Sequence, residues 1–196
     1  MSDSSTPRKA LVTGASSGLG TQYCRQLAAH CDEMIITGRQ PEPLQSLAAE
    51  LEAEGVETHV VVADLASTIG IARLVETIRQ QGPLLYLVNN AGFSTLGPYL
   101  EQEPATQEAM VTLHINATMQ LTLAALGGMR EQQQGFIVNV SSLVALAPFP
   151  SLAVYCATKA FLNNYSVALQ QEVAEHGVKV QCLCPGYIRT NFHKTA

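Results

Sequence analysis

The chain of 196 residues contains no tryptophan, and only 14% of its residues are charged. It has no block of lysine and arginine, and its formal net charge is −5. An acidic chain without a basic block is a poor candidate for binding nucleic acid or an anionic membrane surface. We therefore expect no nucleic-acid partner, and we expect any anionic ligand to be held by local features of the fold.

Long uninterrupted apolar runs are also missing, because the longest are strand-sized or broken by polar residues. We expect no segment that spans a bilayer and no membrane partner. Residues 1–9 are polar and lack the apolar stretch of a secretory signal. Hydrophobic residues make up 47% of the chain, which is enough for one sizeable core. The sequence predicts a single cytoplasmic domain over residues 1–196.

Cysteines are few and odd in number. The five are Cys24, Cys31, Cys156, Cys182 and Cys184. Their spacing matches no zinc-binding pattern, and four of them stand in apolar runs. We interpret them as free, buried thiols of a reducing compartment, and we expect no metal site.

Short β-branched runs alternate with amphipathic stretches along the whole chain. Continuous apolar strands separated by helices are typical of a parallel sheet covered on both faces. The pattern predicts an α/β protein with a doubly wound parallel sheet, a Rossmann fold, whose ligands lie at the carboxyl ends of the strands. Strands are expected at 9–13, 33–37, 57–63, 85–89, 135–141 and 178–184, and helices at 18–30, 41–54, 67–81, 104–130 and 151–176.

The first expected strand runs directly into a loop with three glycines. Gly14 allows a tight turn, Gly18 lets the backbone approach a pyrophosphate, and Gly20 lets the following helix pack on the strand. The helix N-terminus offers N–H groups and a partial positive charge to phosphates. Glycines also serve plain turns, but this position in a strand–helix–strand unit favours a dinucleotide site.

The end of the second expected strand bears on the choice between NAD and NADP. A carboxylate there would bind the ribose hydroxyls and repel a 2′-phosphate. This chain has Arg39 instead, and its next carboxylate is Glu42. A guanidinium forms charge-assisted hydrogen bonds with phosphate, so we favour NADP(H), with Ser16 or Ser17 as secondary contacts. The alternative is that Arg39 is only a solvated surface residue.

Tyr155 and Lys159 are four residues apart, so they share one face of an expected helix. An ammonium about 4 Å from a phenol favours the phenolate by about 4 kcal/mol at an effective dielectric constant near 20. That energy is equivalent to about three pKa units before burial opposes it. The pair therefore predicts a Tyr155 able to transfer protons near neutral pH, although the spacing alone also arises by chance.

The glycine spacing T-G-x-x-x-G-x-G, the sequence N-N-A-G at residues 89–92, Y-x-x-x-K at 155–159 and P-G-x-x-x-T at 185–190 occur in this order. Together they resemble the short-chain dehydrogenase/reductase family over nearly the whole chain. The resemblance implies hydride transfer between NADP(H) and a small carbonyl or alcohol substrate. It implies four catalytic residues, Asn116, Ser142, Tyr155 and Lys159, and cofactor contacts from Gly14, Ser16, Ser17, Gly18, Leu19, Gly20, Arg39, Asp64, Leu65, Asn90, Ala91, Gly92, Tyr155, Lys159, Pro185, Gly186, Ile188 and Thr190.

Several of these roles have local competitors. Ser142 is expected to hold the substrate oxygen, with Ser141 as the alternative. The resemblance implies that Asn116 distorts its helix and holds a water connected to Lys159, whereas His114 is interpreted as a packing or interface residue. Asp64 either caps the adenine ring or only begins the next turn.

The chain ends a few residues after the P-G-x-x-x-T motif, where the resembled family continues with a substrate loop and another strand. We therefore expect a C-terminally incomplete domain whose sixth strand is a sheet edge, and turnover by this exact chain is an open question. A homodimer or homotetramer is expected from the resemblance, and an uncharged or apolar carbonyl compound is the expected substrate. The main alternative is a catalytically silent NADP-binding sensor or scaffold, and a second is an epimerase or dehydratase.

Overall fold

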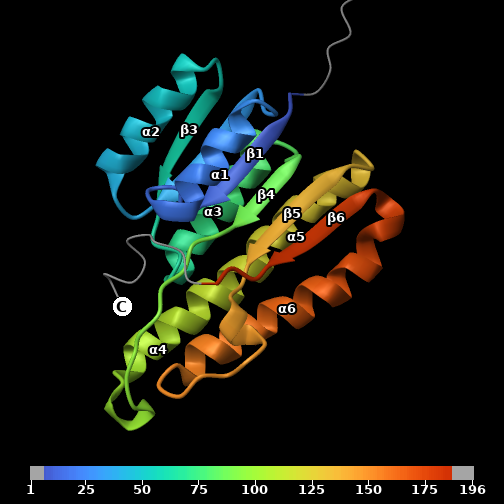
Figure 1. Cartoon of the computed structure of the whole chain (residues 1–196). Coiled ribbons are helices and arrows are strands. Elements are labelled where there is room, and N and C mark those ends of the chain that lie inside the picture. Colours follow the sequence, from blue (N-terminus) through green and yellow to red (C-terminus); the bar gives the residue numbers. More distant parts are fainter. Residues whose placement is uncertain (1–6, 187–196) are drawn as a thin grey trace, which may run out of the picture.

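One parallel sheet organises the molecule. The computed structural model describes residues 7–186, and its six strands follow the order β3-β2-β1-β4-β5-β6 (Figure 1). All the strand pairs are parallel. The strands are β1 Lys9–Thr13, β2 Glu33–Gly38, β3 Glu57–Val62, β4 Tyr86–Asn89, β5 Gly135–Val140 and β6 Val178–Leu183.

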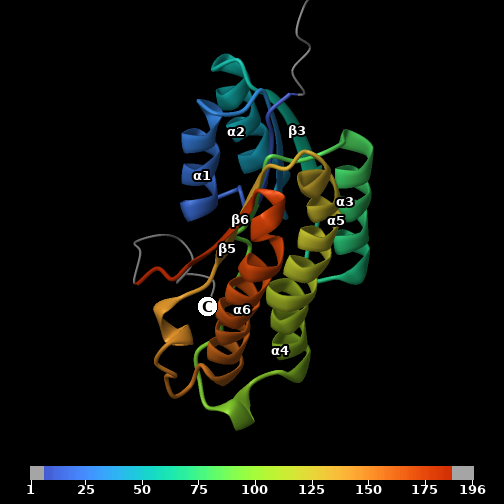
Figure 2. The same ribbon diagram turned by 90° about the vertical axis from the view of Figure 1, so that its right-hand side faces the viewer.

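Helices cover the sheet on two sides (Figure 2). One apolar core lies between the sheet and the first two helices, and another lies between the sheet and the helices that follow β3, β4 and β5. The structure thus confirms the expected doubly wound α/β fold. The helices are α1 Gly18–Ala28, α2 Pro41–Ala53, α3 Thr68–Gln81, α4 Pro104–Val111, α5 Thr118–Glu131 and α6 Ala153–Val173.

Local signals explain where several helices begin. The hydroxyl of Ser67 accepts a hydrogen bond from the backbone N–H of Gly70 and so caps α3. Pro41 stands in the first turn of α2, where its missing N–H costs nothing. These features lie within a few residues of each helix start, which is why the sequence predicts the starts well.

The helix expected over residues 104–130 is interrupted. A π-helical turn, η2 at Thr112–Ala117, separates α4 from α5. The whole stretch Pro104–Glu131 is long and apolar enough to cross a membrane by length and composition, which corrects the expectation that no segment could do so. Core helices pass the same test, and this stretch packs against α3 and α6 and buries Met110, Leu121 and Met129.

A chain of buried amides joins the middle of the sheet to α6. Asn89 Nδ2 donates to Asn139 Oδ1 at 2.9 Å, Asn139 Nδ2 donates to the Ser166 hydroxyl at 2.9 Å, and Ser166 donates to the carbonyl of Leu162 at 2.7 Å. Each group donates to the next, so the directions of all three hydrogen bonds are fixed. This chain ties β4, β5 and α6 together beneath the carboxyl edge of the sheet.

Strand order reverses at β1, which pairs with β2 on one side and β4 on the other. In open α/β sheets, ligands bind outside the carboxyl ends of the strands at such a reversal. The loops after β1, β4 and β5 reach this edge, and they carry most of the expected site residues.

Candidate active site

The glycine loop after β1 has the backbone that its sequence predicts. Gly14 and Gly18 have φ angles of +66° and +57°, a region that L side chains rarely adopt. A Cβ on Gly20 would lie 2.1 Å from the Gly14 carbonyl oxygen, so α1 starts this close to the loop only because residue 20 is glycine. The Ser17 side chain makes no capping bond to α1, and no acidic residue stands in its first turn. The first N–H groups of α1 are thereby suited to phosphate oxygens.

Asn90 holds the glycine loop against the end of β4. Its side-chain Nδ2 donates to the carbonyl oxygens of Thr13 and Gly14 at 2.9 and 3.3 Å. The Thr13 hydroxyl accepts from the backbone N–H groups of Asn90 and Ala91 at 2.9 and 3.0 Å. These bonds use the Asn90 amide for the fold, and they place Ala91 and Gly92 at the same sheet edge as the glycine loop.

The two serines after β5 have different partners. Ser141 is buried, and its hydroxyl donates to the backbone carbonyl of Lys159 at 2.8 Å. The Ser142 hydroxyl accepts a hydrogen bond from the Val144 N–H at 3.4 Å and lies within reach of the Tyr155 hydroxyl, whose pKa it acts to lower. Ser142 therefore faces Tyr155, whereas Ser141 fixes α6 against β5.

Lys159 lies on the same side of α6 as Tyr155 and is almost fully buried. Its Nζ donates to the Val140 carbonyl at 2.8 Å and lies 5.6 Å from the centroid of the Tyr155 ring. Burial lowers the pKa of this amine to about 8. Most of the Lys159 amine is therefore still protonated at neutral pH, and its charge is lost as the pH rises through about 8.

The expected lowering of the Tyr155 pKa by Lys159 is wrong for this structure. Burial raises the pKa of Tyr155 above its usual value of 10.0, and the hydrogen bond with Ser142 opposes that rise. The expectation assumed an ammonium about 4 Å from the phenol. Here the Lys159 amine is held by the Val140 carbonyl beside the ring, so burial dominates the phenol.

The π-helical turn contains both Asn116 and His114, and only one of them contacts the site. Asn116 is exposed, whereas His114 is buried and its ring packs edge-on against Tyr155 with 5.8 Å between centroids. Residues two apart on a helix do not share a face, so both cannot point to α6. The helix is distorted here as expected, and the expected role of the exposed Asn116, holding a water connected to Lys159, stays a prediction. The burial of His114 agrees with its interpretation as a packing residue, and its ring contact places it beside Tyr155.

The expected adenosine contacts are at the ends of β2 and β3. Arg39 is exposed directly after β2, beside Gly38, whose added Cβ would lie 3.1 Å from the Ser16 hydroxyl. The Asp64 carboxylate accepts a hydrogen bond from the Ala66 N–H at 3.0 Å, which is the turn that was the alternative reading. Leu65 is buried in the core, so its side chain serves packing.

The loop after β6 lies against the loop after β5. The backbone N–H of Leu143 donates to the Pro185 carbonyl at 3.0 Å, which brings Pro185 and Gly186 to the carboxyl edge near Ser142. The expected contacts Ile188 and Thr190 lie outside the described residues. The roles given to all the site residues in cofactor binding stay predictions.

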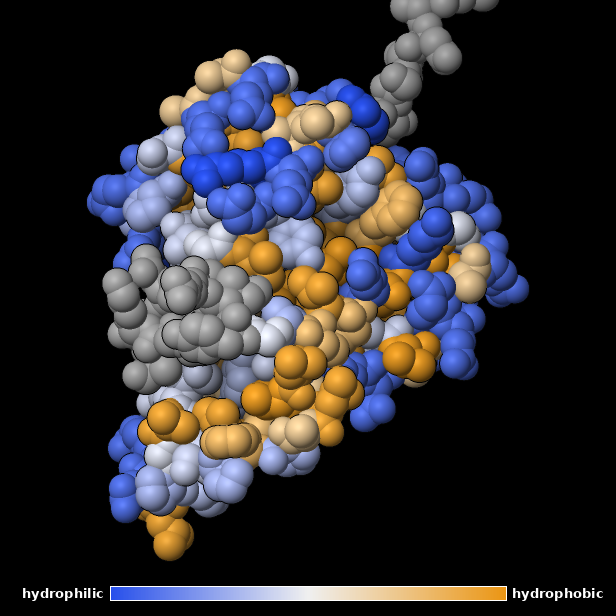
Figure 3. Space-filling model, in the orientation of Figure 1, coloured by the Kyte–Doolittle hydropathy of each residue, from blue (hydrophilic) through white to orange (hydrophobic). Residues whose placement is uncertain are grey.

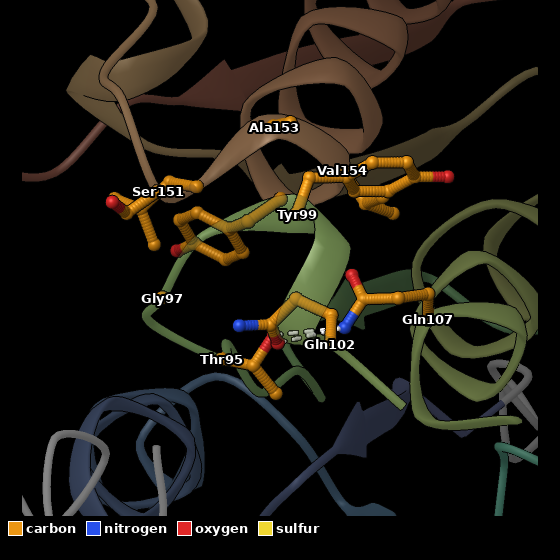
Figure 4. A pocket seen from close by; sticks show the side chains of 10 residues that line it. Thr95, Gly97, Tyr99, Gln102, Gln107, Ser151, Ala153 and Val154 are labelled. Carbon is orange, nitrogen blue, oxygen red and sulfur yellow. Dashed lines mark hydrogen bonds between the residues drawn. The ribbon is translucent and has the colours of Figure 1, made fainter. Parts of the chain in front are cut away.

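A pocket of about 30 Å³ lies beside Tyr155, between the loop after β4 and the start of α6 (Figure 4). The Gln107 side chain donates to the Thr95 hydroxyl at 3.0 Å and to the Gln102 side-chain oxygen at 3.2 Å. The loop is anchored to the start of α6 because the Gly97 N–H donates to the Ser151 carbonyl at 3.1 Å. The pocket lining has no charged side chain and combines neutral polar residues with Leu152, Ala153 and Val154.

Apolar side chains surround the mouth of this region. In Figure 3 they gather over α6 and the loop before it, in contrast to the hydrophilic surface over α2. Leu143, Leu146 and Phe149 are each more than half exposed on the loop after β5, and Leu96 and Leu100 are exposed on the loop after β4. No charged residue occurs at 90–100 or 142–154.

The chain is similar to known proteins over nearly its whole length. The family model described as "short chain dehydrogenase" matches residues 8–196. The "Very-long-chain 3-oxoacyl-CoA reductase" of Anas platyrhynchos is 34% identical over 94% of this chain, which spans 61% of that protein. The "Inactive hydroxysteroid dehydrogenase-like protein 1" of Rattus norvegicus is 35% identical over 94% of this chain, which spans 57% of that protein.

A solved structure gives the same result. The short-chain dehydrogenase from Sphingobium yanoikuyae in complex with NADPH is 32% identical, with a TM-score of 0.92 over 96% of this chain and 74% of that one. The sheet order, the glycine loop and the Ser142–Tyr155–Lys159 cluster agree with this similarity. The chain belongs to the short-chain dehydrogenase/reductase family of oxidoreductases.

Proposed function

We propose that the chain is an NADP(H)-dependent oxidoreductase that transfers a hydride between the cofactor and a carbonyl or alcohol substrate. The observation that carries this proposal is the pair of neighbouring hydroxyls, Ser142 and Tyr155, at the same carboxyl edge of the sheet as the glycine loop. Both hydroxyls would bind one substrate oxygen. A solved relative in complex with NADPH supports the choice of cofactor.

In this proposal the bound cofactor supplies the hydride, and the protein residues manage the substrate oxygen and its proton. Ser142 donates a hydrogen bond to that oxygen, and Tyr155 gives it a proton. The raised pKa keeps Tyr155 protonated at neutral pH, which is the form needed for carbonyl reduction. Lys159 would bind the nicotinamide ribose of the cofactor, and its amine, with a pKa of about 8, is mostly protonated at neutral pH.

The preference for NADP(H) rests on Arg39. The first acidic residue after β2 is Glu42, so no carboxylate competes for the ribose at residues 38–41. An exposed guanidinium at this position provides two or more donors to a 2′-phosphate.

The substrate class follows from the two loops around Tyr155. Residues 90–100 and 142–154 carry no charge, and the nearby pocket is neutral. We therefore propose an uncharged carbonyl compound as substrate, with apolar parts against Leu143, Leu146 and Phe149. Assembly into a homodimer or homotetramer is a further part of the proposal.

The test is NADPH oxidation followed at 340 nm with a panel of uncharged ketones and aldehydes. Tyr155→Phe is expected to lower kcat by at least about 100-fold, because general acid catalysis contributes about that much. NADPH binding, measured by its fluorescence, should change less than about threefold. Tyr165→Phe removes a half-buried phenol from the same helix and is the matched control.

Two results would contradict the proposal. Turnover unchanged in Tyr155→Phe would remove the catalytic role of that residue. Absence of turnover with every carbonyl, while NADPH still binds, would favour the silent sensor or scaffold.

A further inference from the structure

His114 is the most fully engaged polar side chain near Tyr155. It is 1% exposed. Its Nε2 accepts a hydrogen bond from the backbone N–H of Phe93 at 3.2 Å, and its Nδ1 lies 2.9 Å from the Thr158 hydroxyl oxygen. Both ring nitrogens are therefore occupied by protein partners.

These partners determine which nitrogen carries the proton. A backbone N–H only donates, so Nε2 of His114 is unprotonated. The neutral ring then carries its proton on Nδ1 and donates it to Thr158, whose hydroxyl in turn donates to the Tyr155 carbonyl at 2.9 Å. Burial and the nearby charge of Lys159 hold the pKa of His114 well below its usual value, which agrees with a neutral ring.

The two hydrogen bonds join two parts of the proposed site. Phe93 follows Gly92 on the loop after β4, and Thr158 stands between Tyr155 and Lys159 on α6. A Cβ on Gly92 would lie 2.9 Å from His114 Nε2 and 3.5 Å from Lys159 Nζ. The imidazole, Gly92 and the lysine amine thus pack into one small volume, with the Tyr155 ring edge-on to the imidazole.

We propose that His114 is a positioning residue for the hydride-transfer reaction. Its neutral Nδ1–H imidazole ties the loop after β4 to the first turns of α6, and so sets where Tyr155 and Lys159 stand relative to the bound cofactor. This inference rests on the proposed function. The ring acts through Phe93 and Thr158 and has no path of hydrogen bonds to the Tyr155 hydroxyl among these contacts, so it is not a second base.

Substitutions at residue 114 separate the two bonds. An asparagine amide occupies the place of Nδ1, so His114→Asn retains a donor to Thr158 and loses the acceptor for Phe93. A glutamine amide reaches the place of Nε2, so His114→Gln retains the acceptor and loses the donor. His114→Leu loses both, and Thr158→Val removes the α6 partner from the other side. Leu169→Ala removes a buried apolar side chain farther along α6, away from residues 155–159, and is the control for destabilisation alone.

Loss of each bond is expected to lower kcat about tenfold, with the Kd of NADPH changed less than about threefold. His114→Leu should therefore be the slowest variant, and Asn and Gln should each restore part of the rate. In the His114→Leu background, Thr158→Val should have little further effect, because its partner is already gone. Leu169→Ala should lower the melting temperature without changing kcat per folded molecule.

Wild-type kcat in His114→Leu would overturn the proposal. So would a loss of kcat in His114→Leu that neither His114→Asn nor His114→Gln reduces and that matches the fall in folded protein.

A second measurement needs no turnover. It records long-range 1H–15N spectra of the chain without substrate, with His114 assigned from its missing signals in His114→Asn. A neutral Nδ1–H pattern from pH 6 to 8 is expected, and an Nε2–H or protonated ring would overturn the proposal. If the wild-type chain turns over no carbonyl, the proposed function fails. These spectra still decide whether His114 forms its hydrogen bonds to Phe93 and Thr158.

Discussion

At the scale of single residues, burial decides the charge of the groups around Tyr155. Lys159 is enclosed at the end of β5, and the pKa of its amine falls to about 8. His114 is enclosed in the π-helical turn and stays neutral. Tyr155 is shifted the other way, because burial opposes the anionic phenolate. All three groups are pushed toward their uncharged forms, which suits a site that holds a neutral carbonyl compound.

The lowered pKa of His114 predicts a specific loss of stability in acid. Below pH 6.5 residue 114 binds a proton in the unfolded chain but stays unprotonated in the folded chain. Folding stability therefore falls as the pH decreases from 6.5. The slope from this group approaches about 1.4 kcal/mol per pH unit. Urea unfolding midpoints at pH 7, 6 and 5 should fall more steeply for the wild type than for His114→Asn.

Other groups do not obscure this comparison. Asp32, beside Arg8, has its pKa lowered from 3.8 to about 2, so its contribution is lost only at a lower pH than that of His114. Facing His114 are Lys159 and Tyr155, both on α6, and neither has a pKa lowered into the window between pH 5 and 7. Equal slopes for wild type and His114→Asn would show that His114 titrates normally in the folded chain.

At the scale of elements, the contact between β1 and α1 depends on a single missing methyl group. A Cβ on Gly20 would lie 2.1 Å from the Gly14 carbonyl oxygen and 2.7 Å from Asn90 Nδ2. The start of α1 is thereby held at the distance that brings its N–H groups to the carboxyl edge. Gly127, in the middle of α5, has open space around the same position.

This contrast gives a paired test with opposite signs. Gly20→Ala is expected to destabilise the fold by about 2 kcal/mol or more and to weaken NADPH binding, because α1 must move off the loop. Gly127→Ala is expected to stabilise it by about 0.5 to 1 kcal/mol, since alanine favours a helix interior more than glycine does. Thermal unfolding measures both changes. Equal effects of the two substitutions would contradict the close packing at Gly20.

The elements were predictable from sequence to the extent that their signals are local. Strand runs, the Ser67 cap and the glycine loop are each specified within a few residues, and their positions are confirmed to within about three residues. The π-helical turn is different, because it changes which side chain faces α6. A regular helix drawn through the sequence does not show that His114 is buried while Asn116 is exposed. The expectation for the Tyr155 pKa was wrong for a related reason. The residues that bury Tyr155 and the Val140 carbonyl that binds Lys159 come from distant parts of the chain.

At the scale of the whole molecule, the net charge opposes the proposed ligand. The chain carries a formal charge of −5, so the overall field repels a nucleotide with a 2′-phosphate. Binding must then depend on local donors, namely the start of α1 and the exposed Arg39. The sheet reversal at β1 is what brings these two features to one edge.

Removing a single cation distinguishes local from overall electrostatics. Arg39→Ala is expected to raise the Kd of NADPH by about tenfold, which corresponds to one charge-assisted hydrogen bond, and to leave the Kd of NADH nearly unchanged. Arg130→Ala, at the exposed end of α5, changes the net charge by the same amount and should affect neither cofactor. Equal weakening by both substitutions would show that Arg39 acts only through the overall charge.

The buried amides beneath this edge restrict what can replace them more than their volume suggests. Asn139 accepts a hydrogen bond from Asn89 through its side-chain oxygen and donates one to Ser166 through its side-chain nitrogen. An aspartate has the same shape, but its carboxylate has no hydrogen to donate. The Ser166 hydroxyl already donates its own hydrogen to the Leu162 carbonyl, so it cannot donate to the carboxylate. Two oxygens would then face each other in the dry interior between β5 and α6. The need for a donor, and not size, therefore limits which residue can stand at 139. Because every hydrogen bond of the chain runs in one direction, replacing one nitrogen by oxygen is enough to disturb the packing of α6 on β5.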